Sequence, residues 1–190
     1  MIDIGWGAAA FGTRGEVTND TTHRLFAATV LPYLDDALAL ARWLTGNATD
    51  AEDVTQEACL RALRALERGP AENSRAWLLA ITRNTAFTWL ARNRPKTVVL
   101  TADPEAVVSA VEELSQAPDA ALIAAADAAS VEAALLELPL PFREVLVMRE
   151  MSGLSYRDIA AATGVPIGTI MSCLARARRL MLVALKGRME

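Results

Sequence analysis

The chain has 190 residues, of which 53% are hydrophobic but only 5% are aromatic, and its formal net charge is −4. This length allows one domain or two small ones, and the composition favours a core of thin helices over thick sheets. The acidic balance excludes a generally basic coat of the kind that covers many nucleic-acid-binding proteins. Basic side chains instead gather in two blocks, residues 61–96 and 129–190, around an acidic stretch that has no basic residue, 97–128. Two such blocks suggest two contact sites on one polyanion.

The sequence has no pattern of catalytic or metal-binding residues. Cys59 and Cys173 are far apart, and the single histidine, His23, is near neither of them, so no zinc spacing and no disulfide framework is present. Phosphate-binding loops and nucleophile elbows are also missing. There is no charged leader before an apolar segment and no apolar run of ~18 residues. We therefore expect a cytoplasmic protein that is not an enzyme, does not insert into membranes and uses neither metal nor cofactor.

Helical patterns begin after a glycine-rich start. Residues 1–20 have no apolar period and predict a flexible arm. From Thr21 the pattern is helical, with Pro32 expected to restart or kink the helix, which continues to Gly46. A second helix is expected after Asn47, capped by Thr49 or Asp50, up to residues 69–70, where glycine and proline end it.

A third helix is expected from Arg75 to about Asn93, with Ser74 as its cap. Residues 96–127 are acidic and proline-containing, and they predict a linker with some helical content, at 106–114 and 120–129. A helix near residues 131–138, a break at 139–141 and a helix at 142–151 follow. We thus predict an all-α protein with two small helical domains, residues 21–95 and 128–187, joined by a flexible linker.

Residues 155–179 predict a helix-turn-helix in the second domain. Ser155 is a good N-cap, and Asp158 places a negative charge near the positive end of the helix dipole. Gly164 suits a left-handed residue at the end of the first helix, and Pro166 blocks its continuation.

Projection of the second helix separates an apolar face from a basic one. The apolar face contains Ile170, Leu174, Ala177 and Met181. The opposite face contains Gly168, Ser172, Ala175, Arg176 and Arg179. Its side chains are small near the start of the helix and basic further on, which suits a helix in a major groove. An ordinary helical hairpin with a solvated basic face is the alternative.

Three stretches, taken together, resemble bacterial extracytoplasmic-function (ECF) sigma factors of RNA polymerase. They are residues 50–57 (DAEDVTQE), residues 76–84 (AWLLAITRN) and the helix-turn-helix, and the phrase LPLPFREVL at 138–146 also matches. The resemblance covers about residues 21–94 and 128–186. It implies that the first domain binds the polymerase clamp and the minus-ten element, and that the second binds the minus-thirty-five element. It also implies core RNA polymerase, promoter DNA and an anti-sigma factor as partners.

The resemblance also assigns candidate residues, whose chemistry fits the roles. Opening DNA requires a protein that holds bases outside the stack, and the candidates for the minus-ten element are Arg75, Trp77, Arg83, Asn84 and Arg92. Trp77 is equally well explained as a core residue, whereas Asn84 inside an apolar helix needs a hydrogen-bond partner.

The candidates for the minus-thirty-five element are Arg157, Thr169, Ser172, Arg176 and Arg179. Those for the polymerase are Asp53, Gln56 and Glu57, although an acidic first helical turn also explains these three.

Three positions depart from the family pattern. Cys173 replaces a frequent arginine, with packing as its first interpretation, and Thr88 and Trp89 stand where an acid is common. Two other classes stay open: an adaptor that only captures an anti-sigma protein, and a helix-turn-helix repressor. A repressor would leave Arg83 and Asn84 unexplained and would need a dimer on a palindrome.

Overall fold

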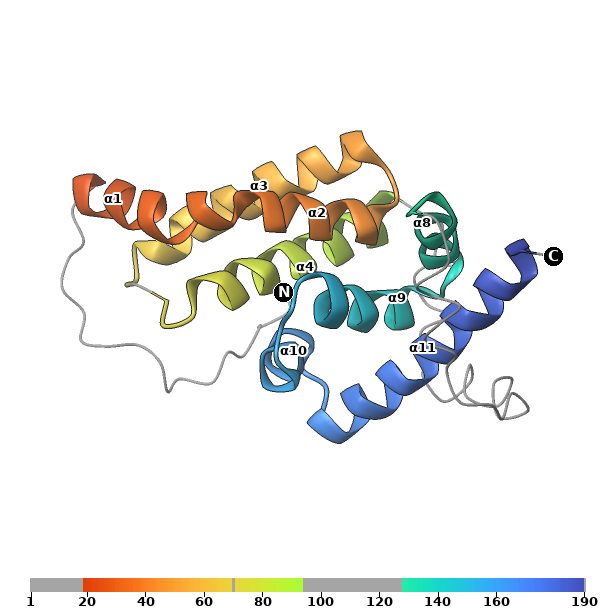
Figure 1. Ribbon diagram of the computed structural model, residues 1–190. Helices are drawn as coiled ribbons and strands as arrows, with labels where there is room; N and C mark the ends of the chain where they lie inside the picture. The colour runs from red at the N-terminus through yellow and green to blue at the C-terminus, as the bar shows by residue number, and fades with distance from the viewer. Residues whose placement is uncertain (1–18, 70, 94–127, 190) are drawn as a thin grey trace.

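The computed structural model describes residues 19–69, 71–93 and 128–189, and every regular element in these ranges is helical (Figure 1). The N-terminal half, residues 19–93, contains α1 (Asn19–Thr29), the 3-10 turn η1 (Leu31–Tyr33), α2 (Leu34–Thr45), α3 (Ala48–Leu66) and α4 (Ser74–Asn93). The C-terminal half, residues 128–189, contains α8 (Ala128–Glu137), α9 (Leu140–Leu146), the π-helical turn η2 (Val147–Met151), α10 (Tyr156–Thr163) and α11 (Ile167–Met189). The predicted all-α class is confirmed. The predicted linker lies outside the described residues. So do the predicted arm, apart from its last two residues, and nearly all of the two helices expected in the linker.

Two predicted helix caps are wrong. Asn47, and neither Thr49 nor Asp50, caps α3: its backbone is extended and its Oδ1 accepts the amide hydrogen of Asp50, with 3.1 Å between N and O. At the start of α4 the cap is Asn73 in place of Ser74, since its Oδ1 accepts an amide hydrogen of the first turn at 3.2 Å. In both cases a short amide side chain just upstream reaches the free N–H groups of the first turn.

In the N-terminal half, α2, α3 and α4 lie side by side (Figure 1). These helices are rich in alanine and threonine, which lets their axes approach closely. The buried threonine hydroxyls donate to the carbonyl one turn earlier on the same helix, for example Thr55 to Ala51 at 2.7 Å and Thr82 to Leu78 at 3.0 Å. The threonines are therefore buried without an unsatisfied hydroxyl.

In the C-terminal half, α11 packs against α8, α9 and α10. Its inner face is the apolar stripe expected from the sequence: Ile170, Leu174, Ala177 and Met181 are all at most 5% exposed. Helix α9 begins earlier than predicted, at Leu140, because proline is tolerated in the first helical turn and Pro141 lies there.

The two halves share one hydrophobic core. One cluster of buried side chains includes Leu40, Leu44 and Leu79 from the N-terminal half together with Ile159 and Leu174 from the C-terminal half. Helix α10 packs against α4, and α9 packs against α2.

Candidate nucleic-acid interface

The helix-turn-helix forms as the sequence predicts. Ser155 and Asp158 make a reciprocal capping box, in which the Ser155 hydroxyl oxygen accepts the amide hydrogen of Asp158 at 3.1 Å. Gly164 has a φ of 74°, the left-handed conformation in which a side chain is strained. The axes of α10 and α11 meet at a bend of 103°, within the range of about 90–120° that is typical of this motif.

The candidate residues of this motif lie mainly on its outward surface. Arg157, Thr169, Ser172 and Arg179 are exposed, and Arg176 is half-buried. The Ser172 hydroxyl donates to the carbonyl oxygen of Thr169 at 2.9 Å, which leaves the oxygen of that hydroxyl available to a further donor. Side chains near the start of this face are small, so a duplex could approach the helix closely.

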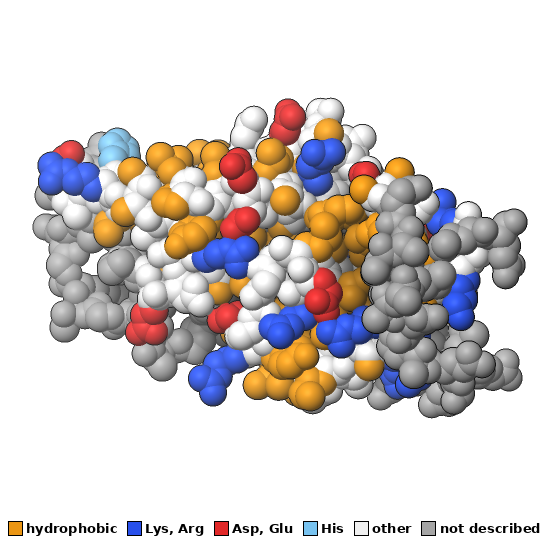
Figure 2. All heavy atoms as spheres, in the orientation of Figure 1, with side chains coloured by type: hydrophobic (Ala, Val, Ile, Leu, Met, Phe, Trp, Pro, Cys, Tyr) orange, Lys and Arg blue, Asp and Glu red, His pale blue; other side chains and the backbone are white. Residues whose placement is uncertain are grey.

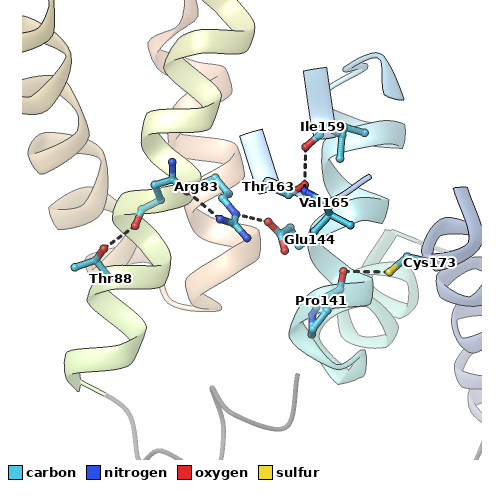
Figure 3. Close-up of polar contacts among 9 residues, drawn as sticks. Arg83, Thr88, Pro141, Glu144, Ile159, Thr163, Val165 and Cys173 are labelled. Carbon is cyan, nitrogen blue, oxygen red and sulfur yellow. Dashed lines mark hydrogen bonds and ion pairs between the residues drawn. The ribbon is translucent and has the colours of Figure 1, made fainter. Parts of the chain in front are cut away.

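Cys173 faces inward and packs, as its position beside the buried stripe indicated. It is half-buried against the main cluster, and its Sγ lies 3.8 Å from the carbonyl oxygen of Pro141, to which it donates (Figure 3). Burial, with a smaller contribution from the nearby carboxylate of Glu144, raises the pKa of the Cys173 thiol to about 11. The side chain is therefore a neutral packing group at neutral pH.

On α4, Arg83 and Asn84 form one hydrogen-bonded unit. Nη1 of Arg83 donates to Oδ1 of Asn84 at 2.9 Å, which gives Asn84 the partner that its position required. The guanidinium carbon of Arg83 also lies 4.1 Å from the centre of the Phe87 ring, a cation–π contact within the same helix. Figure 3 shows the Arg83 side chain pointing away from α4 towards α9, where Nε of Arg83 is paired with Oε1 of Glu144.

Glu144 is a buried carboxylate. Its side chain is 6% exposed, and that of Arg83 is 17% exposed. Burial raises the pKa of Glu144, while the charge and the hydrogen bond of Arg83 act in the opposite direction. Burying a charged carboxylate costs free energy unless the carboxylate is paired. The ion pair with Arg83 therefore allows Glu144 to be buried.

The other minus-ten candidates are spread along α4. Arg75 donates through Nε to Oδ2 of Asp36 at 2.6 Å and through Nη1 to the carbonyl oxygen of Ser152, which lies in the C-terminal half. Trp77 is half-buried and packs against a second hydrophobic cluster in the N-terminal half, as the core interpretation required. Arg92 is exposed near the end of the helix. The structure thus brings Arg83 and Asn84 together and leaves Arg75, Trp77 and Arg92 apart from them.

The three acidic and amide candidates lie on one side of α3. Asp53 and Gln56 are exposed, and Glu57 is partly exposed and accepts from Nε of Arg61 at 2.8 Å. Leu60, one turn further on, is 49% exposed and was not among the candidates. An exposed leucine beside carboxylates makes this surface suitable for a protein partner that carries basic side chains.

Sequence reasoning missed Glu144. It is the only acid in residues 142–148, where every other residue except Arg143 is apolar, and a buried acid in such a stretch needs a partner. That signal was available in the sequence, but its partner is 61 residues away and no spacing rule could identify it.

In the ranges that the structure describes, no cluster of three or more potential metal-ligating side chains occurs. No single helix there is long and apolar enough to cross a membrane, although α10 and α11 together satisfy that test across their bend.

Comparisons with known proteins agree with one another. The sigma-70 region 2 family matches residues 29–96, and the sigma-70 region 4 family matches residues 128–181. The RNA polymerase sigma-H factor of Pseudomonas aeruginosa is 35% identical over 169 residues, which are 86% of this chain and 87% of that protein. The ECF RNA polymerase sigma factor SigC of Mycobacterium tuberculosis is 38% identical over 135 residues, 70% of this chain and 68% of that protein.

Among solved structures, the chain is similar to the sigma factor RpoE of Bartonella quintana, crystallised with the anti-sigma factor NepR. The TM-score is 0.63 at 29% identity, and the match covers 85% of this chain and 96% of that one. The helix-turn-helix, the two matched regions and these relatives define a transcription initiation protein of the sigma-70 class.

The chain belongs to the ECF sigma factors of bacterial RNA polymerase. It is an alternative sigma factor, which binds core polymerase and directs promoter-specific initiation of transcription.

Proposed function

We propose that this sigma factor divides promoter recognition between its two halves, with α4 contacting the minus-ten element and α11 contacting the minus-thirty-five element. The proposal is based mainly on the outward face of α11, where Thr169, Ser172 and Arg179 are exposed. The angle between α10 and α11 is also that of a helix-turn-helix. Direct readout in a major groove requires side chains of this kind on the N-terminal part of the second helix.

Different contacts are proposed for the individual residues. Thr169, Ser172 and Arg176 lie near base edges, and Arg157 and Arg179 bind phosphates, which adds salt-dependent affinity without sequence information. In the other half, Arg83 and Asn84 hold the opened strand, with Arg75 and Arg92 on its backbone. Trp77 stacks on a base only with the part of its ring that the second cluster leaves free.

The polymerase-binding surface is proposed to be the exposed side of α3, with Asp53, Gln56 and Glu57 around Leu60. Leu60 is exposed, and the charged and amide groups lie one to two turns before it on the same helix. In a small interface such an apolar residue provides burial and its polar neighbours provide orientation. We also propose that the protein has no enzymatic activity of its own, because the family to which it belongs consists of transcription initiation proteins. Its action would be in the cytoplasm, with the polymerase.

Regulation by an anti-sigma factor is also proposed. The similar sigma factor of Bartonella quintana was crystallised with such a protein, and the match spans both halves of the present chain. An anti-sigma factor that contacted both halves would block the proposed promoter surfaces together.

The proposed promoter contacts are tested by run-off transcription with core polymerase on promoter DNA that has been selected from a randomised library. Asn84→Ala and Arg176→Ala should each lower initiation by about tenfold or more, since each removes a contact worth roughly 1–3 kcal/mol, while binding to core polymerase persists. Arg178→Ala is the matched control, because Arg178 is on α11 but is paired with Glu150 on η2, and it should leave initiation nearly unchanged.

Two results would contradict the proposal in different ways. A chain that binds core polymerase but never initiates would favour the adaptor that only captures an anti-sigma protein. If Arg178→Ala impaired initiation as strongly as Arg176→Ala, the outward face of α11 would not be the DNA-reading face.

A further inference from the structure

Two large apolar side chains are exposed at the start of α11. Ile167, the first residue of the helix, is 44% exposed, and Met171, one turn further on, is 53% exposed. Neither belongs to the two clusters of buried side chains. Single exposed apolar residues are common on protein surfaces, but these two are neighbours, because residues four apart lie one above the other on a helix. They form an apolar edge beside the outward face of α11.

The space in front of this part of α11 is open. A Cβ atom added at Gly168 would meet no atom of the described residues within 4 Å, and Ser172 and Ala175 are small and exposed. Because the Cα–Cβ bonds of a helix tilt towards its N-terminus, the Met171 side chain covers the turn that begins at Ile167. It therefore lies over the end of α11 whose residues contact base edges when a helix-turn-helix binds DNA.

The charges around the apolar edge indicate what covers it. In Figure 2, hydrophobic side chains gather at the lower edge of the displayed face, over the region where Figure 1 draws α10 and the turn into α11, and basic side chains lie next to them. Arg157 on α10 and Arg179 on α11 are exposed, and Arg176 is half-buried. A partner at this surface must be anionic around a place where it is apolar. Duplex DNA fits, since its phosphates flank a major groove in which the C5-methyl group of thymine is apolar.

We infer that Met171 is a specificity-determining residue for the minus-thirty-five element, where its side chain contacts a thymine methyl group in the major groove. The inference rests on the proposed role of α11 in binding that element. The contact distinguishes thymine from cytosine, which presents no methyl group. Methionine suits it because an unbranched, polarizable side chain adjusts to the position of the methyl group. Ile167, one turn earlier, extends the apolar surface that the methyl group meets.

The contact is tested on the holoenzyme, the sigma factor bound to core polymerase, with promoter duplexes selected from a randomised minus-thirty-five region. The selected sites should be enriched in an A·T pair. Each of their thymines is then replaced in turn by deoxyuridine, which removes only the C5-methyl group, and binding is measured by fluorescence anisotropy of the labelled duplex. One replacement should weaken binding of the unmodified holoenzyme about fourfold, which corresponds to ~0.8 kcal/mol for one buried apolar carbon.

Met171→Ala completes a double-mutant cycle with this replacement. The variant should bind the thymine duplex about fourfold more weakly, and deoxyuridine should then cause almost no further loss, because the side chain that contacts the methyl group is gone. Val183→Ala is the matched control, since Val183 is also exposed on α11, at 44%, but lies three turns further on. The fourfold effect of deoxyuridine should persist in it.

The salt dependence of binding separates this contact from one to a phosphate. Arg179→Ala should reduce that dependence, because a phosphate contact releases counterions. Met171→Ala should leave it unchanged, since an apolar contact releases none. A reduced salt dependence for Met171→Ala would show that the substitution displaces the basic residues of α11, and would contradict a direct apolar contact.

Other results would also overturn the inference. Selected sites without an enriched A·T pair, or an affinity that no deoxyuridine replacement changes, would show that no thymine methyl group is read. Equal losses from deoxyuridine with and without Met171→Ala would assign the methyl contact to another side chain. Weaker binding of Met171→Ala to core polymerase alone would place Met171 against the polymerase. Failure of the proposed role of α11 would appear separately, because Arg176→Ala would then bind the selected duplex as tightly as the unmodified holoenzyme does.

Discussion

Replacing Leu174 with alanine tests the rotation of α11 about its axis, on which the assignment of its DNA-reading face depends. Leu174 is 1% exposed, and the substitution removes three carbon atoms from the core. At ~0.8 kcal/mol for each buried carbon, the transfer contribution is about 2.4 kcal/mol. The cavity left behind brings the expected loss of unfolding free energy to about 3–4 kcal/mol.

The assay is thermal and urea unfolding followed by circular dichroism at 222 nm. A loss of this size should lower the melting temperature by about 10 °C for a chain of this length. Met171→Ala is the matched control, because Met171 is on the same helix but 53% exposed, and it should change the unfolding free energy by less than ~0.5 kcal/mol. Equal losses for the two variants would refute the orientation of α11, and with it the choice of Thr169, Ser172 and Arg176 as base contacts.

Two other predictions concern the helix-turn-helix. Ser155→Ala removes the capping box and should lower the unfolding free energy by about 1 kcal/mol, seen as a lower urea midpoint; an unchanged midpoint would mean that the box contributes nothing. Cys173, with a pKa of about 11 against an ordinary 9.0, has a thiolate fraction at pH 8 that is about 100-fold smaller than usual. Its alkylation by iodoacetamide at that pH should be slower by about this factor than in the denatured chain, and equal rates would contradict the described burial.

Local signals explain which parts of the fold could be predicted. The helix-turn-helix was predictable because its determinants are close in sequence: a cap at Ser155, a left-handed glycine at Gly164, and a helical apolar period after it. The caps of α3 and α4 were misassigned for a local reason too, since Asn47 and Asn73 lie just upstream of residues that are also good caps. Composition alone does not decide between such neighbours.

The candidate site was predictable only within each half. Arg83 and Asn84 were both named as candidates from one stretch of helix, and the structure joins them by a hydrogen bond. The ion pair of Arg83 with Glu144 and the bond of Arg75 to Ser152 join residues that are distant in sequence. Such contacts depend on how the halves pack, for which the spacing of residues gives no rule.

The shared core has a thermodynamic consequence. Separation of the halves exposes apolar side chains to water, so opening has a positive heat-capacity change and the apolar contribution to closure weakens on cooling. The free-energy cost of desolvating the ion pair of Arg83 and Glu144 also falls on warming. The ionic contribution to closure therefore strengthens on warming, as the apolar contribution does. The conformational entropy gained when the halves separate favours opening as the temperature rises, so closure is most stable at an intermediate temperature and weakens on both cooling and strong heating.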